Sequence, residues 1–115
     1  MEQDCLFCKI VNREIPAKIF YEDDDLLAFY DIEPATPVHI LLIPKQHIAN
    51  ILEATEADQD LLKHILVTVP KLAKQAGIDE AGFRTVINTK DNGGQTVHHM
   101  HLHILGGRFM TWPPG

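Results

Sequence analysis

The sequence has no long hydrophobic run and no excess of positive charge. No stretch approaches the 18 or so apolar residues of a membrane-spanning helix, and Met1-Glu2-Gln3-Asp4 lacks the basic and apolar regions of a signal peptide. We therefore expect a soluble, cytoplasmic protein with no membrane partner. A formal net charge of −6 argues against a nucleic-acid partner, because nucleic-acid binders usually carry clustered Lys and Arg.

Cysteine is scarce, and the two cysteines, Cys5 and Cys8, lie close together near the start of the chain. A structural disulfide is not expected in the cytoplasm, so the pair could be free thiols, a redox pair or half of a metal site. A redox motif would need a strand before it, and only four residues precede Cys5. A zinc site would need two further ligands from elsewhere.

The hydrophobic pattern predicts one domain, residues 1–115, of the α+β class, because 115 residues with 45% hydrophobic content suit a single modest core. We expect a short N-terminal helix and one long amphipathic helix that begins at a Thr55 capping box and ends at Gly77. Pattern and turn signals predict an antiparallel five-stranded sheet with strands at 18–22, 26–31, 38–43, 83–88 and 97–105.

The segment 97–105 contains four of the seven histidines. In a strand, its period of two places His99, His101 and His103 on one face and the apolar residues between them on the other. The apolar face would pack on the core, so that the histidines line a cleft. His39 is the one polar residue of the strand 38–43, and a buried histidine needs a partner.

Three chemistries remain open for the histidine row: a metal site, a structural cluster and nucleophilic catalysis. Two imidazolium ions about 7 Å apart repel by roughly 2 kcal/mol at an effective dielectric near 20, so the rings are not all charged near neutral pH. A neutral nucleophile beside one protonated donor suits attack on phosphorus. The turn Asn92-Gly93-Gly94-Gln95-Thr96 is either a tight hairpin turn or an anion site that delivers Thr96 and Asn88 to the row.

The segment His99-Met100-His101-Leu102-His103-Ile104-Leu105 resembles the His-φ-His-φ-His-φ-φ signature of the histidine-triad (HIT) superfamily of nucleotide hydrolases and transferases. The ending, residues 105–108 and 112–115, resembles the Hint branch, whose members hydrolyse nucleoside 5′-phosphoramidates. The resemblance also extends through residues 15–18, 28–32, 37–39, 43–47 and 93–97.

The resemblance implies a purine nucleoside 5′-phosphoramidase that acts on an AMP-like substrate without a catalytic cofactor. It makes His101 the nucleophile that forms a nucleotidyl-histidine, His103 a phosphate contact and His39 a supporting residue. The remaining implied substrate contacts are Asn88, Gln95 and Thr96 for the phosphate, Asp31 for the ribose, Phe7, Ile10, Ile15, Phe29 and Ile32 for the base, and Trp112 in the C-terminal tail.

The resemblance further implies a homodimer with a continuous ten-stranded sheet, in which Trp112 approaches the partner's active site. It also implies a structural zinc ion held by Cys5, Cys8, His47 and His99. The sequence departs from the family pattern at Thr96, where we expect serine, and at His98, where we expect an aromatic residue. Two alternative functions remain: a nucleotide-binding interaction module with little turnover, and a zinc-handling protein whose histidine row binds the metal.

Overall fold

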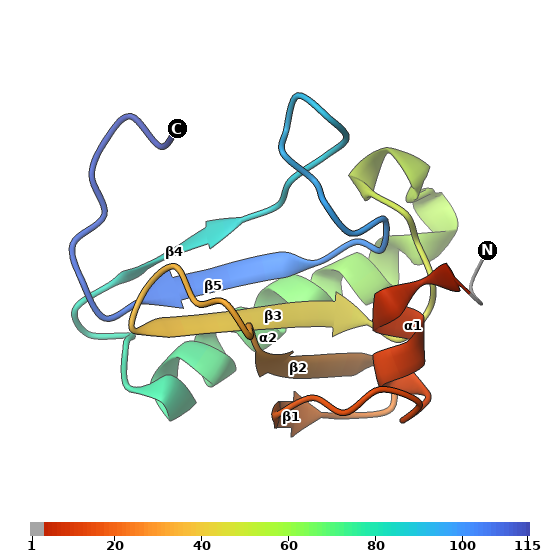
Figure 1. Ribbon diagram of the computed structural model, residues 1–115, viewed down its shortest axis with the longest axis horizontal. Coiled ribbons are helices and arrows are strands. Elements are labelled where there is room, and N and C mark those ends of the chain that lie inside the picture. The colour runs from red at the N-terminus through yellow and green to blue at the C-terminus, as the bar shows by residue number, and fades with distance from the viewer. Residues whose placement is uncertain (1–3) are drawn as a thin grey trace.

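The computed structural model describes residues 4–115, so the expectation drawn from Met1 to Gln3 lies outside the described residues. The five strands form one antiparallel sheet in the order β1-β2-β3-β5-β4 (Figure 1). Within the described part, no helix has both the length and the apolar character needed to cross a membrane. In chain order the elements are α1 Leu6–Val11, β1 Ile19–Glu22, β2 Leu26–Tyr30, β3 Val38–Pro44, the 3₁₀ turns η2 Ile51–Glu53 and η3 Glu56–Asp58, α2 Gln59–Ala76, β4 Phe83–Val86 and β5 Leu102–Gly106.

The sheet is covered by a different helix on each face. Figure 1 shows α2 behind the sheet, where its buried Ile65, Val69 and Leu72 pack into one core cluster. The short helix α1 lies on the opposite face, and its Phe7 and Ile10 belong to a second core cluster. Because α2 covers the other face and α1 is short, part of the sheet face beneath α1 remains uncovered and can hold the site.

Strand register places the candidate residues on the α1 face. Phe29 of β2 lies opposite Leu41 of β3, Leu41 opposite His103 of β5, and His103 opposite Val86 of β4. Directly opposed residues share a face of the sheet, so these four form a row across it. His103 therefore lies on β5, with β2 and β3 on one side and the edge strand β4 on the other.

The predicted capping box and C-terminal limit of the long helix are confirmed, but the α-helix itself begins at Gln59, later than predicted. Thr55 forms a capping box with Asp58, which starts the 3₁₀ turn η3, and η3 leads directly into α2. Gly77 ends α2 in the left-handed conformation, with φ of 75°, where glycine carries no steric penalty. The buried face of α2 is narrower than its apolar residues suggest, because Leu66 is 61% exposed.

The predicted strand 97–105 is wrong at its N-terminal end. β5 begins at Leu102, so that His103 is the only triad histidine within the ladder. The residues before it leave the sheet, and the Met100 N–H donates to the Ile48 carbonyl at 2.6 Å instead. The tight hairpin is also wrong, because β4 ends at Val86 and residues 87–101 form a long loop.

Candidate active site and metal centre

His39 and His103 form a hydrogen-bonded pair on neighbouring strands, with 2.9 Å between His39 Nε2 and His103 Nδ1. The backbone N–H of Ala35 donates to His39 Nδ1 at 3.0 Å, so the lone pair of that nitrogen is occupied. Neutral His39 therefore carries its proton on Nε2 and donates it to His103 Nδ1. In consequence, neutral His103 carries its own proton on Nε2.

His101 has the opposite tautomer. Its Nδ1 lies 2.7 Å from the carbonyl oxygen of His99, and a carbonyl only accepts, so Nδ1 carries the proton. Nε2 of neutral His101 then keeps a free lone pair. The rings of His101 and His103 are 5.0 Å apart between centroids, which places a proton acceptor or nucleophile beside the N–H donor of His103.

Burial favours the neutral form of all three rings. It lowers the pKa of His103 to about 4, assisted by the His101 and His39 rings and opposed by Asp31. Burial also lowers the pKa of His101, against the opposing effects of the His99 carbonyl and Asp31. The pKa of His39 is likewise lowered by burial and raised by Asp31. At neutral pH the three rings are therefore uncharged, and their hydrogen bonds determine which nitrogen of each ring carries the proton.

Asp31 lies beside this pair at the end of β2. Its Oδ2 is 3.4 Å from His39 Nε2, and its Oδ1 accepts from the Glu33 N–H at 2.8 Å. Asp31, His39 and His103 offer ligand atoms within 4.8 Å of one another, but the facing nitrogens of the two histidines already bond to each other. The carboxylate is partly exposed and can accept hydrogen bonds from a ligand hydroxyl.

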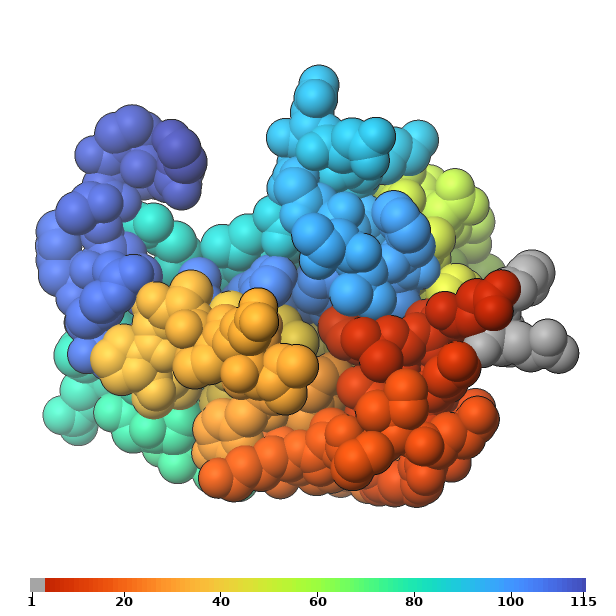
Figure 2. Space-filling model, in the orientation of Figure 1, coloured from red at the N-terminus to blue at the C-terminus, as the bar shows by residue number. Residues whose placement is uncertain are grey.

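A pocket of about 350 Å³ opens next to His101 and His103. It is bounded by α1, the loop after β2 and the loop before β5, which converge in Figure 2. Phe7 stands edge-on to the His101 ring at 5.1 Å and to Phe29 at 5.4 Å between centroids. The sequence-predicted residues that line this pocket are Phe7, Ile10, Ile15, Phe29, Asp31, Ile32, Thr96, His101 and His103.

Three further predicted contacts lie outside the lining of this pocket. The Nε2 group of Gln95 donates to the carbonyls of Ala49 and Val97, at 2.7 and 3.0 Å, and its Oε1 accepts from a backbone N–H. Gln95 therefore holds the loop, and both of its amide hydrogens are used within the chain. Asn88 donates to the carbonyl of Gly93 at 2.7 Å. Trp112 is 79% exposed on the C-terminal tail.

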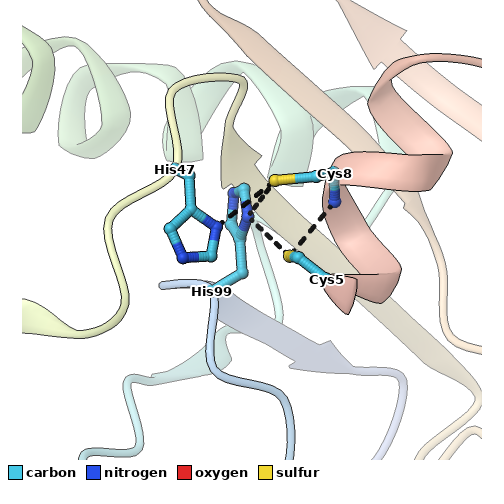
Figure 3. Close-up of side chains that lie close together, drawn as sticks. All are labelled: Cys5, Cys8, His47 and His99. Atoms are coloured by element: carbon cyan, nitrogen blue, oxygen red, sulfur yellow. Dashed lines mark hydrogen bonds between the residues drawn. The ribbon is translucent and has the colours of Figure 1, made fainter. Parts of the chain in front are cut away.

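A second cluster joins Cys5 and Cys8 of the N-terminal segment to His47 and His99 (Figure 3). Their ligand atoms all lie within 4.8 Å of one another. Cys5 Sγ is 3.3 Å from His99 Nδ1, and Cys8 Sγ is 3.3 Å from His47 Nδ1. The four residues predicted as zinc ligands are thus brought together.

The donor set fits a zinc ion. Tetrahedral coordination with Zn–S near 2.3 Å and Zn–N near 2.0 Å separates sulfur from nitrogen by about 3.5 Å, close to the observed separations. His99 is fully buried, and its Nε2 donates to the Pro44 carbonyl at 2.7 Å, which leaves Nδ1 facing the sulfurs. A carbonyl partner of this kind fixes the tautomer of a metal-binding histidine. Two cysteines and two histidines would close the shell, as in a structural site.

The two sites share His99 and Phe7. The side chain of His99 belongs to the metal centre, whereas its carbonyl orients His101. Phe7 follows Cys5 in α1 and contacts the rings of both His99 and His101. Sequence reasoning missed the backbone groups of Ala35, Pro44 and His99, because a main-chain N–H or carbonyl leaves no signature in residue identity.

Comparison with known proteins identifies the class of this fold and site. The HIT domain family model matches residues 12–110, and the chain belongs to that family. The fold is accordingly the HIT fold, with its antiparallel five-stranded sheet and one long helix.

Similar proteins match this chain over all or nearly all of its length. An uncharacterised HIT-like protein of Synechococcus elongatus is 61% identical over 100% of both chains. A 14 kDa zinc-binding protein of Brassica juncea is 51% identical over 97% of this chain and 100% of its own. The crystal structure of a HIT family hydrolase from Legionella pneumophila matches with a TM-score of 0.95 and 54% identity, covering 97% of this chain and 100% of that one.

Proposed function

We propose that the protein is a purine nucleoside 5′-phosphoramidate hydrolase that releases AMP or a related nucleotide. The observation that carries the proposal is the free lone pair on His101 Nε2, held beside the N–H donor of His103 at the mouth of an apolar pocket. A carbonyl and a second histidine fix the two opposite tautomers, as a nucleophile and an adjacent phosphate donor require.

The reaction would run in two steps. His101 Nε2 attacks the α-phosphorus, the P–N bond breaks, and the amine takes up a proton as it leaves. His103 Nε2–H donates to a phosphoryl oxygen, and His39 holds His103 in the tautomer that allows this. Water then cleaves the nucleotidyl-histidine and restores His101. Apolar walls would hold the base, with Asp31 accepting from the ribose hydroxyls.

We extend the proposal to the phosphate contacts and the dimer. Thr96 lines the pocket and supplies a hydroxyl, whereas Gln95 would have to exchange an internal bond for a phosphate contact. β4 lies at the edge of the sheet, and Leu66 of α2 and Ile87, which directly follows β4, line a common pocket and are 61% and 38% exposed. Pairing of β4 with its copy would cover these side chains and give the ten-stranded homodimer.

A structural zinc ion at Cys5, Cys8, His47 and His99 completes the proposal. It is supported by the convergence of the four donors and by the zinc-binding relative. Among the described residues, neither Cys5 nor Cys8 forms a disulfide, which suits a reducing cytoplasm. The zinc-handling alternative predicts metal on the histidine row, but only His99 of that row reaches the cysteines.

Turnover of adenosine 5′-phosphoramidate by wild type and His101→Ala tests the function. We expect AMP release by wild type and a loss of at least about 10³-fold in the variant. His98→Ala is the matched control, since His98 is an exposed neighbour on the same segment. Full turnover by His101→Ala would reject the nucleophile assignment. Tight AMP binding without turnover by wild type would favour the nucleotide-binding interaction module instead.

A further inference from the structure

A second pocket, of about 450 Å³, lies on the other side of His103 from the proposed nucleoside pocket. Figure 2 shows the hollow between the C-terminal tail (dark blue) and the loop before β5 (light blue), with β4 and β5 at its floor. Its walls include Arg84 and Val86 of β4, Leu105 of β5, and Arg108 and Thr111 of the tail. Asn88, a predicted phosphate contact, also lines the pocket, whereas these five residues have no role in the proposed reaction.

The strand register places this pocket next to the reacting groups. Val86 lies directly opposite His103, and Arg84 lies opposite Leu105 on the same face. The proposed nucleoside pocket is lined by Phe29 and Leu41 from the strands on the other side of His103. A substrate with its phosphorus at His101 and His103 and its nucleoside in the first pocket therefore has its leaving group nearest the second.

The second pocket carries two positive charges without acidic partners. The chain has three arginines, and two of them, Arg84 and Arg108, lie here. Each donates to backbone carbonyls, Arg84 to Thr111 at 3.0 Å and Arg108 to Phe109 at 3.0 Å and Ala35 at 3.4 Å. Within residues 4–115 neither guanidinium forms an ion pair, and no acidic side chain lines the pocket.

This charge distribution indicates an anionic ligand. A guanidinium has five N–H donors in a planar fork, so each arginine keeps donors beyond its bonds to carbonyls. Such a fork binds a carboxylate in a bidentate manner. In a chain with a formal net charge of −6, these two arginines form no ion pair with any described residue, and Arg84 lies 5.9 Å from the centre of the Trp112 ring. Two such charges in one pocket beside the reacting histidine favour a carboxylate there.

We propose that Arg84 and Arg108 bind the leaving group, and that the preferred substrates are nucleoside phosphoramidates of amino acids with a free carboxylate. The proposal rests on the phosphoramidase function. The P–N bond to the amino nitrogen breaks, its electron pair stays on that nitrogen, and the nitrogen takes a proton from water. The amino acid leaves with its carboxylate intact, and the hydroxide left by that water attacks the phosphorus of the nucleotidyl-His101, which releases the nucleotide and restores neutral His101.

Two substrates that differ only in charge test the proposal: the adenosine 5′-phosphoramidates of alanine and of alaninamide. The measured quantity is the ratio of their kcat/KM values in each enzyme. The difference in leaving-group basicity contributes equally in every enzyme, so it cancels when the ratios of two enzymes are compared. Arg84→Gln combined with Arg108→Gln should lower the acid-to-amide ratio by about tenfold or more, the scale of one charge-assisted hydrogen bond. Arg84→Lys should retain part of the preference, because it keeps the charge.

The matched control is Lys63→Gln, which removes one positive charge from an exposed position on α2, on the far face of the sheet. It should leave the ratio unchanged. A ratio that is the same in wild type and the double arginine variant would overturn the leaving-group assignment. Unsubstituted adenosine 5′-phosphoramidate, which releases ammonia, is the reference: its turnover with an unchanged ratio rejects this proposal alone, whereas no turnover of any substrate rejects the phosphoramidase function as well.

Discussion

Removal of zinc should lower thermal stability without dismantling the proposed nucleoside pocket. The wall at issue is α1, whose six residues are too few for a stable isolated helix. Two interactions hold α1 in place: the Cys5, Cys8, His47, His99 cluster and the packing of Phe7 and Ile10, which are 4% and 6% exposed. Their relative sizes decide whether the pocket survives loss of the metal.

Burial of two large apolar side chains contributes about 1.5–3 kcal/mol each, so Phe7 and Ile10 together hold α1 by at most about 3–6 kcal/mol. A metal present at 100 times its dissociation constant adds about 2.7 kcal/mol to the stability of the folded state. At this saturation packing is the larger contribution, and on that basis α1 should stay docked without metal. At roughly 4 °C per kcal/mol for a chain of this length, chelation should lower Tm by about 10 °C.

Thermal unfolding with and without AMP, in the presence and absence of a zinc chelator, measures both effects. Chelation or Cys8→Ser should lower Tm while AMP still raises it. Phe7→Ala, which removes packing against Phe29 and His101 but no metal ligand, should abolish the AMP-induced rise. If chelation removed the AMP-induced rise as completely as Phe7→Ala does, the metal would be the main support of the pocket and the packing argument would be refuted.

Three further predictions concern single residues. Burial raises the pKa of Asp23, but hydrogen bonds outweigh it and lower the pKa from 3.8 to about 2; the donors are Tyr21, Asp25, Leu26 and His64. The ionised Asp23 carboxylate therefore stabilises the fold by about 1 kcal/mol after solvent screening. This contribution is complete above pH 3.8 and is lost as the pH falls through 2. The stability difference between wild type and Asp23→Asn, followed by urea unfolding from pH 7 to pH 2, should shrink accordingly, and a constant difference would contradict the assignment. His39→Ala leaves the Ala35 N–H and His103 Nδ1 without their partner, so kcat for adenosine 5′-phosphoramidate should fall about 10- to 100-fold, with AMP affinity by calorimetry changing less; equal losses in both would indicate general disruption. In Gly106→Ala the new Cβ would lie 2.7 Å from Ile78 Cδ1, so urea unfolding should show a loss of about 1–3 kcal/mol, and wild-type stability would show that Ile78 can move aside.

Local chemistry made much of the fold predictable. The Thr55 capping box, the Gly77 stop and the alternating or apolar runs act through neighbouring residues, so the sequence alone locates the helix and four of the strands. The start of β5 was not predictable in this way. An alternating pattern at residues 97–101 describes a strand equally well, and what ends the ladder at Leu102 is a contact between His99 and cysteines more than 90 residues away.

In the site, too, residue identities were predictable from the sequence, whereas contacts between distant residues were not. Side-chain identities pointed to the histidines and to the four zinc ligands, the latter through resemblance, because convergence of residues distant in sequence cannot be read from spacing. Gln95 shows the limit: its amide is as suited to a phosphate as to the loop, and only the positions of the Ala49 and Val97 carbonyls show that it bonds within the chain. Arg84 belongs to no sequence motif, and only its position opposite Leu105 in the sheet places it on the same face as His103.

The first histidine of the signature thus differs in kind from the other two. A fully buried imidazole is costly unless both nitrogens have partners, and for His99 these are the cysteine sulfurs and the Pro44 carbonyl. Continuing β5 back to residue 97 would break both contacts, so satisfying His99 requires the chain to leave the sheet. That departure turns the His99 carbonyl onto His101 Nδ1 and leaves Nε2 available. The metal centre and the nucleophile are therefore consequences of one bend, and a variant that straightens this segment should lose both together.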